Sequence, residues 1–411
     1  MRILLVNPPM WQFIGGRLNF NPNLGLMYLA SILRNEHEVQ IYDFEALGWT
    51  LEQSLNFIKS FKPDVLGITG TTYAFPAVQW ISRKSKELGI KVVVGGPHAT
   101  AMPERTLEKT KCDLVIKYEA EEVVLDCLGE TGIIEGKRTD VKKLPFPAWD
   151  LMHPPINSEK FVGNAPRYKQ PESVVMWSRG CPHRCKFCSN PVFRHQPTRF
   201  RDPDNIVEEL TILHEEYGIN SFFVYDDELI GQSPRQNKWL IEVCQKIIES
   251  GLKIEMKCQG RCSPFVTDEV ISAMKQAGFK AVMLGCESGS QVVLDAIQKA
   301  TKPEWIEQTV KTIYNNGLDV WGFWMVQNLK ETPEEARKTE ELIKKLKPYM
   351  KFKQVTIATP WPGSELYEIA TKNNWIFDTN LSHWIASVPV MNTPWMSAKE
   401  AIYWRNRLLE V

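Results

Sequence analysis

Three cysteines lie close together near the middle of the chain, in the segment Ser-Arg-Gly-Cys-Pro-His-Arg-Cys-Lys-Phe-Cys. Cys181, Cys185 and Cys188 follow a short apolar run that is typical of a strand, and Gly180 and Pro182 place them on a loop. Three thiolates on one loop can hold three corners of an iron-sulfur cluster and leave the fourth iron open to a ligand. The spacing therefore predicts a cluster with a reactive iron.

Two other roles for these cysteines fit their surroundings less well. Free cysteine is often a small buried apolar side chain, but the neighbours on this loop are polar. A closed zinc site takes four ligands, usually as two close pairs, and the pair Cys258 and Cys262 does not suit because Cys262 lies beyond the end of an expected strand. Arg184 and Lys186 would favour the thiolate form that binds metal.

Length and charge set the frame for this loop. The 411 residues exceed one ordinary hydrophobic core, which predicts two domains. Lys plus Arg and Asp plus Glu both total 49, so no nucleic acid or anionic membrane is expected as a partner. No apolar run is long enough for a transmembrane segment. The nine cysteines are odd in number and mostly scattered, which predicts reduced thiols and a cytoplasmic location.

Residues 1–130 alternate between β-branched runs and helix-like segments. This alternation predicts an α/β unit with a doubly wound, flavodoxin-like parallel sheet, in which ligands bind beyond the carboxyl ends of the strands. Glycines follow two of these ends, although tight turns alone would also explain them. Strands are expected at residues 3–6, 39–42, 65–69, 91–94 and 114–116, and helices at residues 24–35, 51–59, 75–88 and 103–109.

The rest of the chain divides into three parts. Residues 131–172 are rich in proline and are expected to form a linker. Residues 173–374 alternate again and predict a partial (β/α)6 barrel with ligand residues at its strand ends. Residues 375–411 form a short C-terminal extension rich in tryptophan. The six strands are expected at residues 173–177, 221–225, 254–258, 281–285, 320–325 and 354–358.

The cysteine spacing, with an aromatic residue directly before the last cysteine, resembles that of the radical SAM superfamily. In that family the open iron of a four-iron four-sulfur (4Fe-4S) cluster binds S-adenosylmethionine, and reductive cleavage gives a 5'-deoxyadenosyl radical. The resemblance implies S-adenosylmethionine contacts for Phe187, Tyr225, Asp226, Asp227, Arg261, Glu287 and Ser288. Relatives read Gly-Leu-Pro-Gly-Glu-Thr after the fifth strand, whereas this chain has Gln327, Asn328 and Lys330 before Glu331 and Thr332, so a different local backbone is expected.

The first 130 residues resemble the cobalamin-binding domain that precedes many radical SAM barrels, in methyltransferase-like and anaerobic cyclase-like members. The resemblance rests on stretches such as Val-Asn-Pro-Pro at residues 6–9 and Val-Gly-Gly-Pro-His at residues 94–98. The Asp-x-His-x-x-Gly element that presents a histidine to cobalt is absent from the first loop, so no histidine from that loop is expected as the lower cobalt ligand. The implied cobalamin contacts are Thr69, Thr71, Thr72, Gly95, Gly96 and His98.

The two resemblances together imply a radical SAM enzyme that uses a 4Fe-4S cluster, S-adenosylmethionine and cobalamin, most directly a methyltransferase acting on an unactivated carbon. A cyclase, an oxidase or a carbon-carbon bond-forming enzyme with the same cofactors stays open, as does a non-catalytic cobalamin or redox sensor. The expected partners are a small-molecule, lipid or ring-system substrate and a reductant such as flavodoxin or ferredoxin. No catalytic side chain is assigned.

Overall fold

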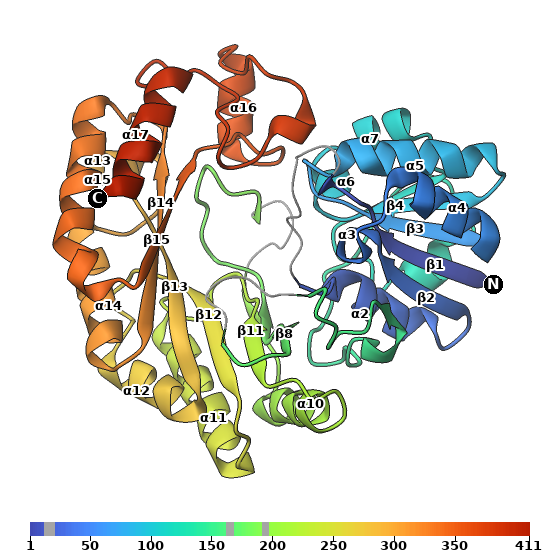
Figure 1. The fold of residues 1–411 in the computed structure, drawn as a ribbon, viewed down its shortest axis with the longest axis horizontal. Coiled ribbons are helices and arrows are strands. Elements are labelled where there is room, and N and C mark those ends of the chain that lie inside the picture. The colour runs from blue at the N-terminus through green and yellow to red at the C-terminus, as the bar shows by residue number, and fades with distance from the viewer. Residues whose placement is uncertain (12–20, 162–167, 191–196) are drawn as a thin grey trace.

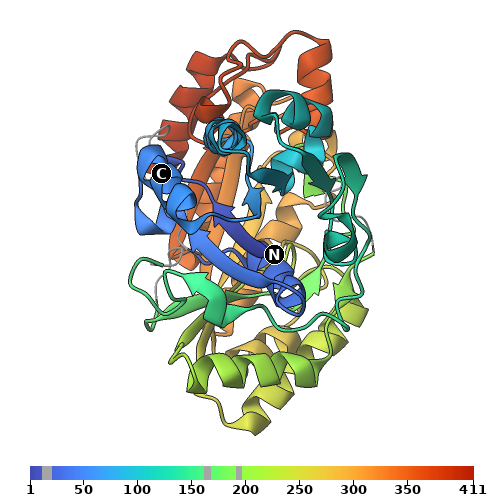
Figure 2. The same cartoon turned by 90° about the vertical axis from the view of Figure 1, so that its right-hand side faces the viewer.

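Two parallel sheets, one in each half of the chain, organise the molecule and lie side by side (Figure 1). The computed structural model describes residues 1–11, 21–161, 168–190 and 197–411. In the view turned by 90°, the blue N-terminal unit stands in front of the second unit, whose red C-terminal segments lie at the top (Figure 2). No helix in these described ranges is long and apolar enough to cross a membrane.

The first sheet has the strand order β6-β5-β4-β3-β1-β2-β7, and all its pairs are parallel. The inner order β2-β1-β3-β4-β5 is that of a flavodoxin-like sheet, so the predicted fold of this half is confirmed. The strands are β1 (Arg2–Asn7), β2 (Glu38–Asp43), β3 (Val65–Thr69), β4 (Lys91–Gly95), β5 (Leu114–Lys117), β6 (Gly132–Glu135) and β7 (Met152–His153).

Helices cover both faces of this sheet. Because successive strand residues point to opposite faces, Leu4 and Val6 belong to one core cluster with helices α4 and α5, whereas Ile3 and Leu5 belong to another with α2 and α8. The helices are α2 (Leu24–Leu33), α3 (Phe44–Leu47), α4 (Leu51–Phe61), α5 (Phe75–Glu87), α6 (Pro97–Ala101), α7 (Pro103–Thr110) and α8 (Val124–Cys127).

The edges of the first sheet come from residues 131–172, which the sequence predicts as a linker. Strand β6 pairs with β5, and β7 pairs with β2 directly after the short 3-10 helix η1 (Trp149–Leu151). Each edge strand spans only a few residues, too few for an alternating pattern to be recognised.

The second sheet has the order β15-β14-β13-β12-β11-β8, with all pairs parallel. Its six strands follow one another in chain order and β8 does not pair with β15, so the predicted partial barrel is confirmed. The strands are β8 (Glu172–Val175), β11 (Ser221–Val224), β12 (Glu255–Arg261), β13 (Phe279–Glu287), β14 (Asp319–Val326) and β15 (Phe352–Ile357). The helices are α10 (Pro203–Glu215), α11 (Pro234–Ser250), α12 (Asp268–Ala277), α13 (Gln291–Ala296), α14 (Pro303–Asn315) and α15 (Pro333–Leu346).

Local sequence signals set where the barrel helices begin and end. The side chains of Ser233, Thr267 and Thr332 cap the amino ends of α11, α12 and α15 by accepting a backbone N–H, as short hydroxyl side chains do at this position. Gly251 and Gly278 end α11 and α12 in the left-handed conformation. These boundaries fix the loops at the carboxyl ends of the strands.

The C-terminal segment joins the two units. After β15 it contains α16 (Glu365–Lys372), η3 (Leu381–His383) and α17 (Ala398–Glu410), whereas η2 (Lys347–Tyr349) lies before β15. Arg407 on α17 pairs with Glu340 on α15 at 2.8 Å, so this helix docks on the barrel. In contrast, Leu381, Trp384 and Val390 belong to the core cluster of the first sheet. The extension therefore packs against both halves of the molecule.

Candidate functional site

The cysteine loop leaves the barrel after β8 and is closed at its base by a two-stranded ribbon. Strand β9 (Ser178–Arg179) pairs antiparallel with β10 (Arg199–Phe200). The Cys188 N–H donates to the Cys185 carbonyl at 3.0 Å, and the Lys186 backbone bonds to the end of α13 and the start of α16 at 3.0 and 2.7 Å. The three predicted thiols are thus held over the carboxyl ends of the barrel strands.

Two acids that follow β11 anchor this loop. Asp226 accepts the Trp177 N–H at 2.8 Å and the Ser178 hydroxyl, and Asp227 accepts the Asn190 side-chain amide at 2.8 Å. Burial raises the pKa of Asp226 to about 7, although both hydrogen bonds act in the opposite direction. Asp226 and Asp227 therefore hold the base of the cysteine loop, and their contact with S-adenosylmethionine stays a prediction.

Two buried cations lie near Cys185. The Arg261 Nη1 atom is 3.8 Å from the Cys185 sulfur, and its Nη2 atom is buried and has no hydrogen-bond partner among the described residues. Lys299 pairs with Glu287 at 2.7 Å. The charged ends of both side chains occupy the space that a Cβ on Gly285 would take. Burial alone would lower the pKa of Lys299, but Glu287 and Cys185 raise it above its ordinary value. Arg261 and Lys299, rather than the exposed Arg184, are the cations that face the thiols.

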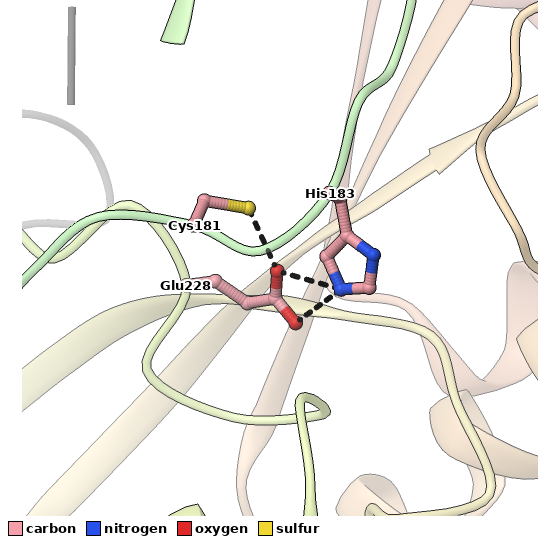
Figure 3. A group of neighbouring side chains, drawn as sticks. All are labelled: Cys181, His183 and Glu228. Carbon is pink, nitrogen blue, oxygen red and sulfur yellow. Dashed lines mark hydrogen bonds and ion pairs between the residues drawn. The ribbon is translucent and has the colours of Figure 1, made fainter. Parts of the chain in front are cut away.

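A second group of possible ligands includes Cys181 (Figure 3). The Glu228 carboxylate lies 3.2 Å from the Cys181 sulfur and 3.3 Å from the His183 Nε2 atom. Burial raises the pKa of the Cys181 thiol, and Glu228 raises it further. Burial also raises the pKa of Cys188 to about 12. Both thiols are therefore protonated until a metal displaces the proton.

Phe187, Tyr225 and Ser288, which are also predicted to contact S-adenosylmethionine, lie in three different surroundings. Phe187 lies under Lys299, with the ammonium group 5.7 Å from the ring centre. Tyr225 is 45% exposed and lines the cavity described below. Ser288 is fully buried, and its hydroxyl lies 3.1 Å from that of Thr339, so it belongs to the packing behind β13.

The loop after β14 keeps a glycine-like backbone without glycine. Gln327 and Lys330 have φ of 65° and 61°, in the left-handed region that L residues rarely adopt. Glu331 stabilises the turn by accepting the Asn328 N–H at 2.9 Å. Gln327 and Lys330 thus adopt a conformation that favours glycine, the residue that relatives have at these two positions, and a different local backbone stays a prediction.

A cavity of about 570 Å³ lies between the two units. Its floor is the face of the first sheet that carries Gly67, Thr69 and Gly95, and its opposite wall includes Met176 and Tyr225 of the barrel. The floor lies beside β1 and β3, the point at which the strand order of the sheet reverses its direction. Doubly wound sheets bind their ligands at this point.

The predicted cobalamin residues divide into two sets. Thr69, Thr71, Gly95 and Gly96 line the cavity. His98 and Thr72 do not: both are buried, with the His98 Nδ1 atom 3.2 Å from the Thr72 hydroxyl, and the His98 ring packs on Phe75. Burial lowers the pKa of His98 to about 3, which keeps the ring neutral. His98 and Thr72 are therefore part of the core beside α5 instead of the cavity surface.

Buried ion pairs join the cysteine loop to the first unit at the edge of this cavity. Arg179 on β9 pairs with Glu121 at 2.6 Å, and its guanidinium lies 4.8 Å from the Tyr28 ring centre. Arg199 on β10 forms an ion pair with Glu119. These contacts fix the spacing between the loop and the sheet.

The site residues suit the iron-sulfur cluster and the cobalamin that the sequence implies. Three thiols on one loop suit an anionic cluster. The buried guanidinium beside them, with an N–H that no described residue accepts, suits a carboxylate ligand. On the cavity floor, a side chain on Gly95 would meet only the Ile116 carbonyl, at 3.6 Å, so a flat group can approach the backbone there. Residues 12–15 of the first loop, where the cobalt-binding histidine of many relatives is absent, lie outside the described residues.

Comparison with known proteins decides the family. Residues 175–346 match the model of the radical SAM superfamily, and residues 15–128 match that of the B12 binding domain. The uncharacterized methyltransferase PH0819 of Pyrococcus horikoshii is 34% identical, over 95% of this chain and 88% of that protein. The chain belongs to the cobalamin-binding radical SAM family. Its cofactors are accordingly a 4Fe-4S cluster, S-adenosylmethionine and cobalamin.

More distant members of the family differ in activity. The anaerobic magnesium-protoporphyrin IX monomethyl ester cyclase of Rubrivivax gelatinosus is 26% identical, over 98% of this chain and 75% of that protein. The cobalamin-dependent S-adenosylmethionine radical enzyme OxsB has a solved structure with a TM-score of 0.74, at 17% identity, covering 93% of this chain and 63% of that chain. This last likeness supports the fold of both units.

Three residues of the site were not predicted from the sequence: Lys299, Glu228 and Arg179. Lys299 follows a short helix, where a lysine is ordinary and points to no ligand. Glu228 closes the acidic run after β11, so its place at a strand end was a usable signal. Arg179 could not be recognised because its partner Glu121 lies 58 residues away in the other unit.

Proposed function

We propose that this protein is a cobalamin-dependent C-methyltransferase that acts on an unactivated carbon of an apolar small molecule in the cytoplasm. The observation that supports this best is the cavity between the units, because its floor carries Gly95 and Thr69 and its wall carries Tyr225 and Asn190 beside the cysteine loop. A substrate held there would lie between the two cofactor sites. The nine free thiols fit a reducing compartment.

The barrel residues bind and orient S-adenosylmethionine in this proposal. When bound, the cluster supplies the electron that cleaves S-adenosylmethionine to a hydrogen-abstracting radical, and cobalamin carries the methyl group. Arg261 donates from its unpaired Nη2 atom to the carboxylate, and Lys299 adds a second buried positive charge. Glu287 holds Lys299 in place, and Tyr225 covers the ligand from the cavity side.

The floor of the first sheet holds cobalamin in this proposal. Gly95 and Gly96 would let the ring lie against the backbone, the Thr69 hydroxyl would bond to its polar edge, and Thr71 would line the cavity beside it. The cavity continues along β3 from Thr69 to Val65, a length of about 13 Å at the ordinary rise of a strand. That apolar extension suits the aromatic base of the cofactor's nucleotide tail.

A labelling experiment tests the proposed reaction. The anaerobic protein, reconstituted with cluster and cobalamin, is incubated with a metabolite extract and S-adenosylmethionine that carries a deuterated methyl group. We expect a metabolite that gains the label together with S-adenosylhomocysteine and 5'-deoxyadenosine. A Gly95→Val protein should lose the labelled product but still form deoxyadenosine, because its barrel is intact.

The kinship with the anaerobic cyclase supports a second candidate, a cyclase or oxidase that uses the same cofactors without methyl transfer. Deoxyadenosine with no S-adenosylhomocysteine and no label in any product would favour this second function. Absence of deoxyadenosine from a protein with a full cluster would refute both functions.

A further inference from the structure

One face of the second sheet carries uncovered aromatic side chains beside the cysteine loop. This inner face consists of the alternate strand residues on the side of Arg261, which lies 3.8 Å from the Cys185 sulfur. Tyr225, just past the end of β11, and Phe352 on β15 belong to this face, and each is 45% exposed. We infer that the inner face holds a planar, uncharged ring whose edge carries a cyclic amide, and that Gln259 positions this substrate, an inference that rests on the proposed function.

Strand pairing places Gln259 on the inner face, one step below Arg261. Both residues lie on β12, two positions apart, so their side chains leave the strand on the same side, about 7 Å from each other. The register of the sheet sets Gln259 beside Met283 and sets Met283 beside Trp321. A molecule that contacts Gln259 therefore lies directly beneath the S-adenosylmethionine that Arg261 would bind.

Aromatic rings lie on both sides of Gln259 along the inner face. Tyr225 is its neighbour on the strand β11 side, because the residues directly before the two are paired in register. On the other side, Trp321 on β14 lies against Phe352, with ring centres 4.2 Å apart. Phe323, two positions after Trp321, is only partly buried. Flat aromatic side chains bind a flat ring through its faces and edges, so the inner face suits a planar ring.

The charged residues that flank Gln259 on the inner face already have partners or a ligand. The ammonium group of Lys257 lies 2.8 Å from both carboxylate oxygens of Glu172, and both side chains are 1% exposed. Arg261 is assigned to S-adenosylmethionine in the proposed function. A charged substrate on this face would bury its charge without a partner, which is strongly unfavourable. The ring is therefore uncharged.

The Gln259 amide offers a donor and an acceptor side by side. The side chain is partly buried and forms no hydrogen bond with any described residue, so its carbonyl and its NH₂ group are both available. A cyclic amide carries an N–H next to a carbonyl, so it can satisfy both groups of the glutamine at once. A carboxylate has no donor to offer and would leave the glutamine carbonyl unpaired.

Three bicyclic probes test this substrate class by ligand-observed NMR on the reconstituted full-length protein with S-adenosylmethionine bound. 2-Quinolone carries the cyclic amide edge, N-methyl-2-quinolone has the same ring with its N–H blocked, and 2-naphthoate carries a charge. We expect 2-quinolone to bind about three- to tenfold more tightly than the other two. Gln259→Met should abolish this preference, and Phe323→Leu should weaken the binding of 2-quinolone by a similar factor.

Two measurements separate loss of the contact from damage to the protein. Gln245→Met makes the same replacement at an exposed position on α11 and should leave the affinity for every probe unchanged. The dissociation constant for S-adenosylmethionine should be the same in Gln259→Met and in the wild type. Equal binding of 2-quinolone and its N-methyl derivative, tighter binding of 2-naphthoate, or a preference that survives Gln259→Met would overturn the substrate class. Absence of 5'-deoxyadenosine from the same wild-type samples after reduction would instead refute the proposed function.

Discussion

Replacing Arg261 by methionine is expected to weaken S-adenosylmethionine binding while leaving the free protein at least as stable. Arg261 is 4% exposed and its Nη2 atom has no partner in the part of the chain that the structure describes, so the free protein carries the cost of a buried, unsatisfied donor. That cost is about 1–3 kcal/mol, and Arg261→Met removes it while it keeps most of the packing. The midpoint of urea unfolding should therefore stay constant or rise.

The loss of affinity follows from the same geometry. A charge-assisted hydrogen bond contributes about 1.5–3 kcal/mol, so the dissociation constant for S-adenosylmethionine should rise about 10- to 150-fold. Anaerobic calorimetry on cluster-loaded protein measures it, with iron analysis of the same samples.

Arg179→Met is the matched control, because Arg179 is 6% exposed but pairs with Glu121 at 2.6 Å. Removing it leaves a buried carboxylate unpaired, which should destabilise the protein by about 3–5 kcal/mol. An unchanged dissociation constant for Arg261→Met, or destabilisation as large as that of Arg179→Met, would refute the assignment of Arg261 to the ligand.

Two further predictions concern the first unit. Gly95→Val should fold normally but bind less cobalamin. Gly96→Ala should instead destabilise the protein itself by about 1–3 kcal/mol, because Gly96 has φ of 90° and an added Cβ would lie 2.5 Å from the Thr69 hydroxyl. Cobalt analysis and thermal unfolding distinguish the two variants, and an equal loss of stability in both would contradict an open cavity floor at Gly95. Burial raises the pKa of Asp43 to about 7, so its contribution to stability is present at acid pH and is lost as the pH rises through 7. Between pH 6 and pH 8 the loss is about 1.4 kcal/mol, and Asp43→Asn should remove it from the urea unfolding curve; a variant with the wild-type pH dependence would show that Asp43 is not buried as a neutral acid.

Most strands could be predicted because parallel strands buried on both faces are continuous apolar runs. The expected strand at residues 65–69 is β3 itself, and the other long strands are within a few residues of their predicted bounds. The ribbon of β9 and β10 and the edge strands β6 and β7 were missed, because two to four residues carry no period and their pairing depends on distant partners.

The site could be predicted where local spacing decides it, as for the three cysteines and for Arg261 at a strand end. It could not be predicted where chain-distant packing decides it. His98 follows the glycines after β4 in sequence, yet the turn into α6 directs it beneath Phe75 and away from the cavity. Lys299 reaches the thiols only because Gly285 leaves space for its pair with Glu287.

The most direct test of the central claim is reductive cleavage of S-adenosylmethionine by the reconstituted, dithionite-reduced protein, measured as 5'-deoxyadenosine by mass spectrometry. Wild-type protein should form deoxyadenosine, and Cys185→Ala should lose both the cluster iron and the cleavage. Cys244→Ala, a substitution at a fully buried core cysteine on α11, should keep both. Deoxyadenosine formed by Cys185→Ala at the wild-type rate would contradict the assignment of the cysteine loop as the catalytic iron site.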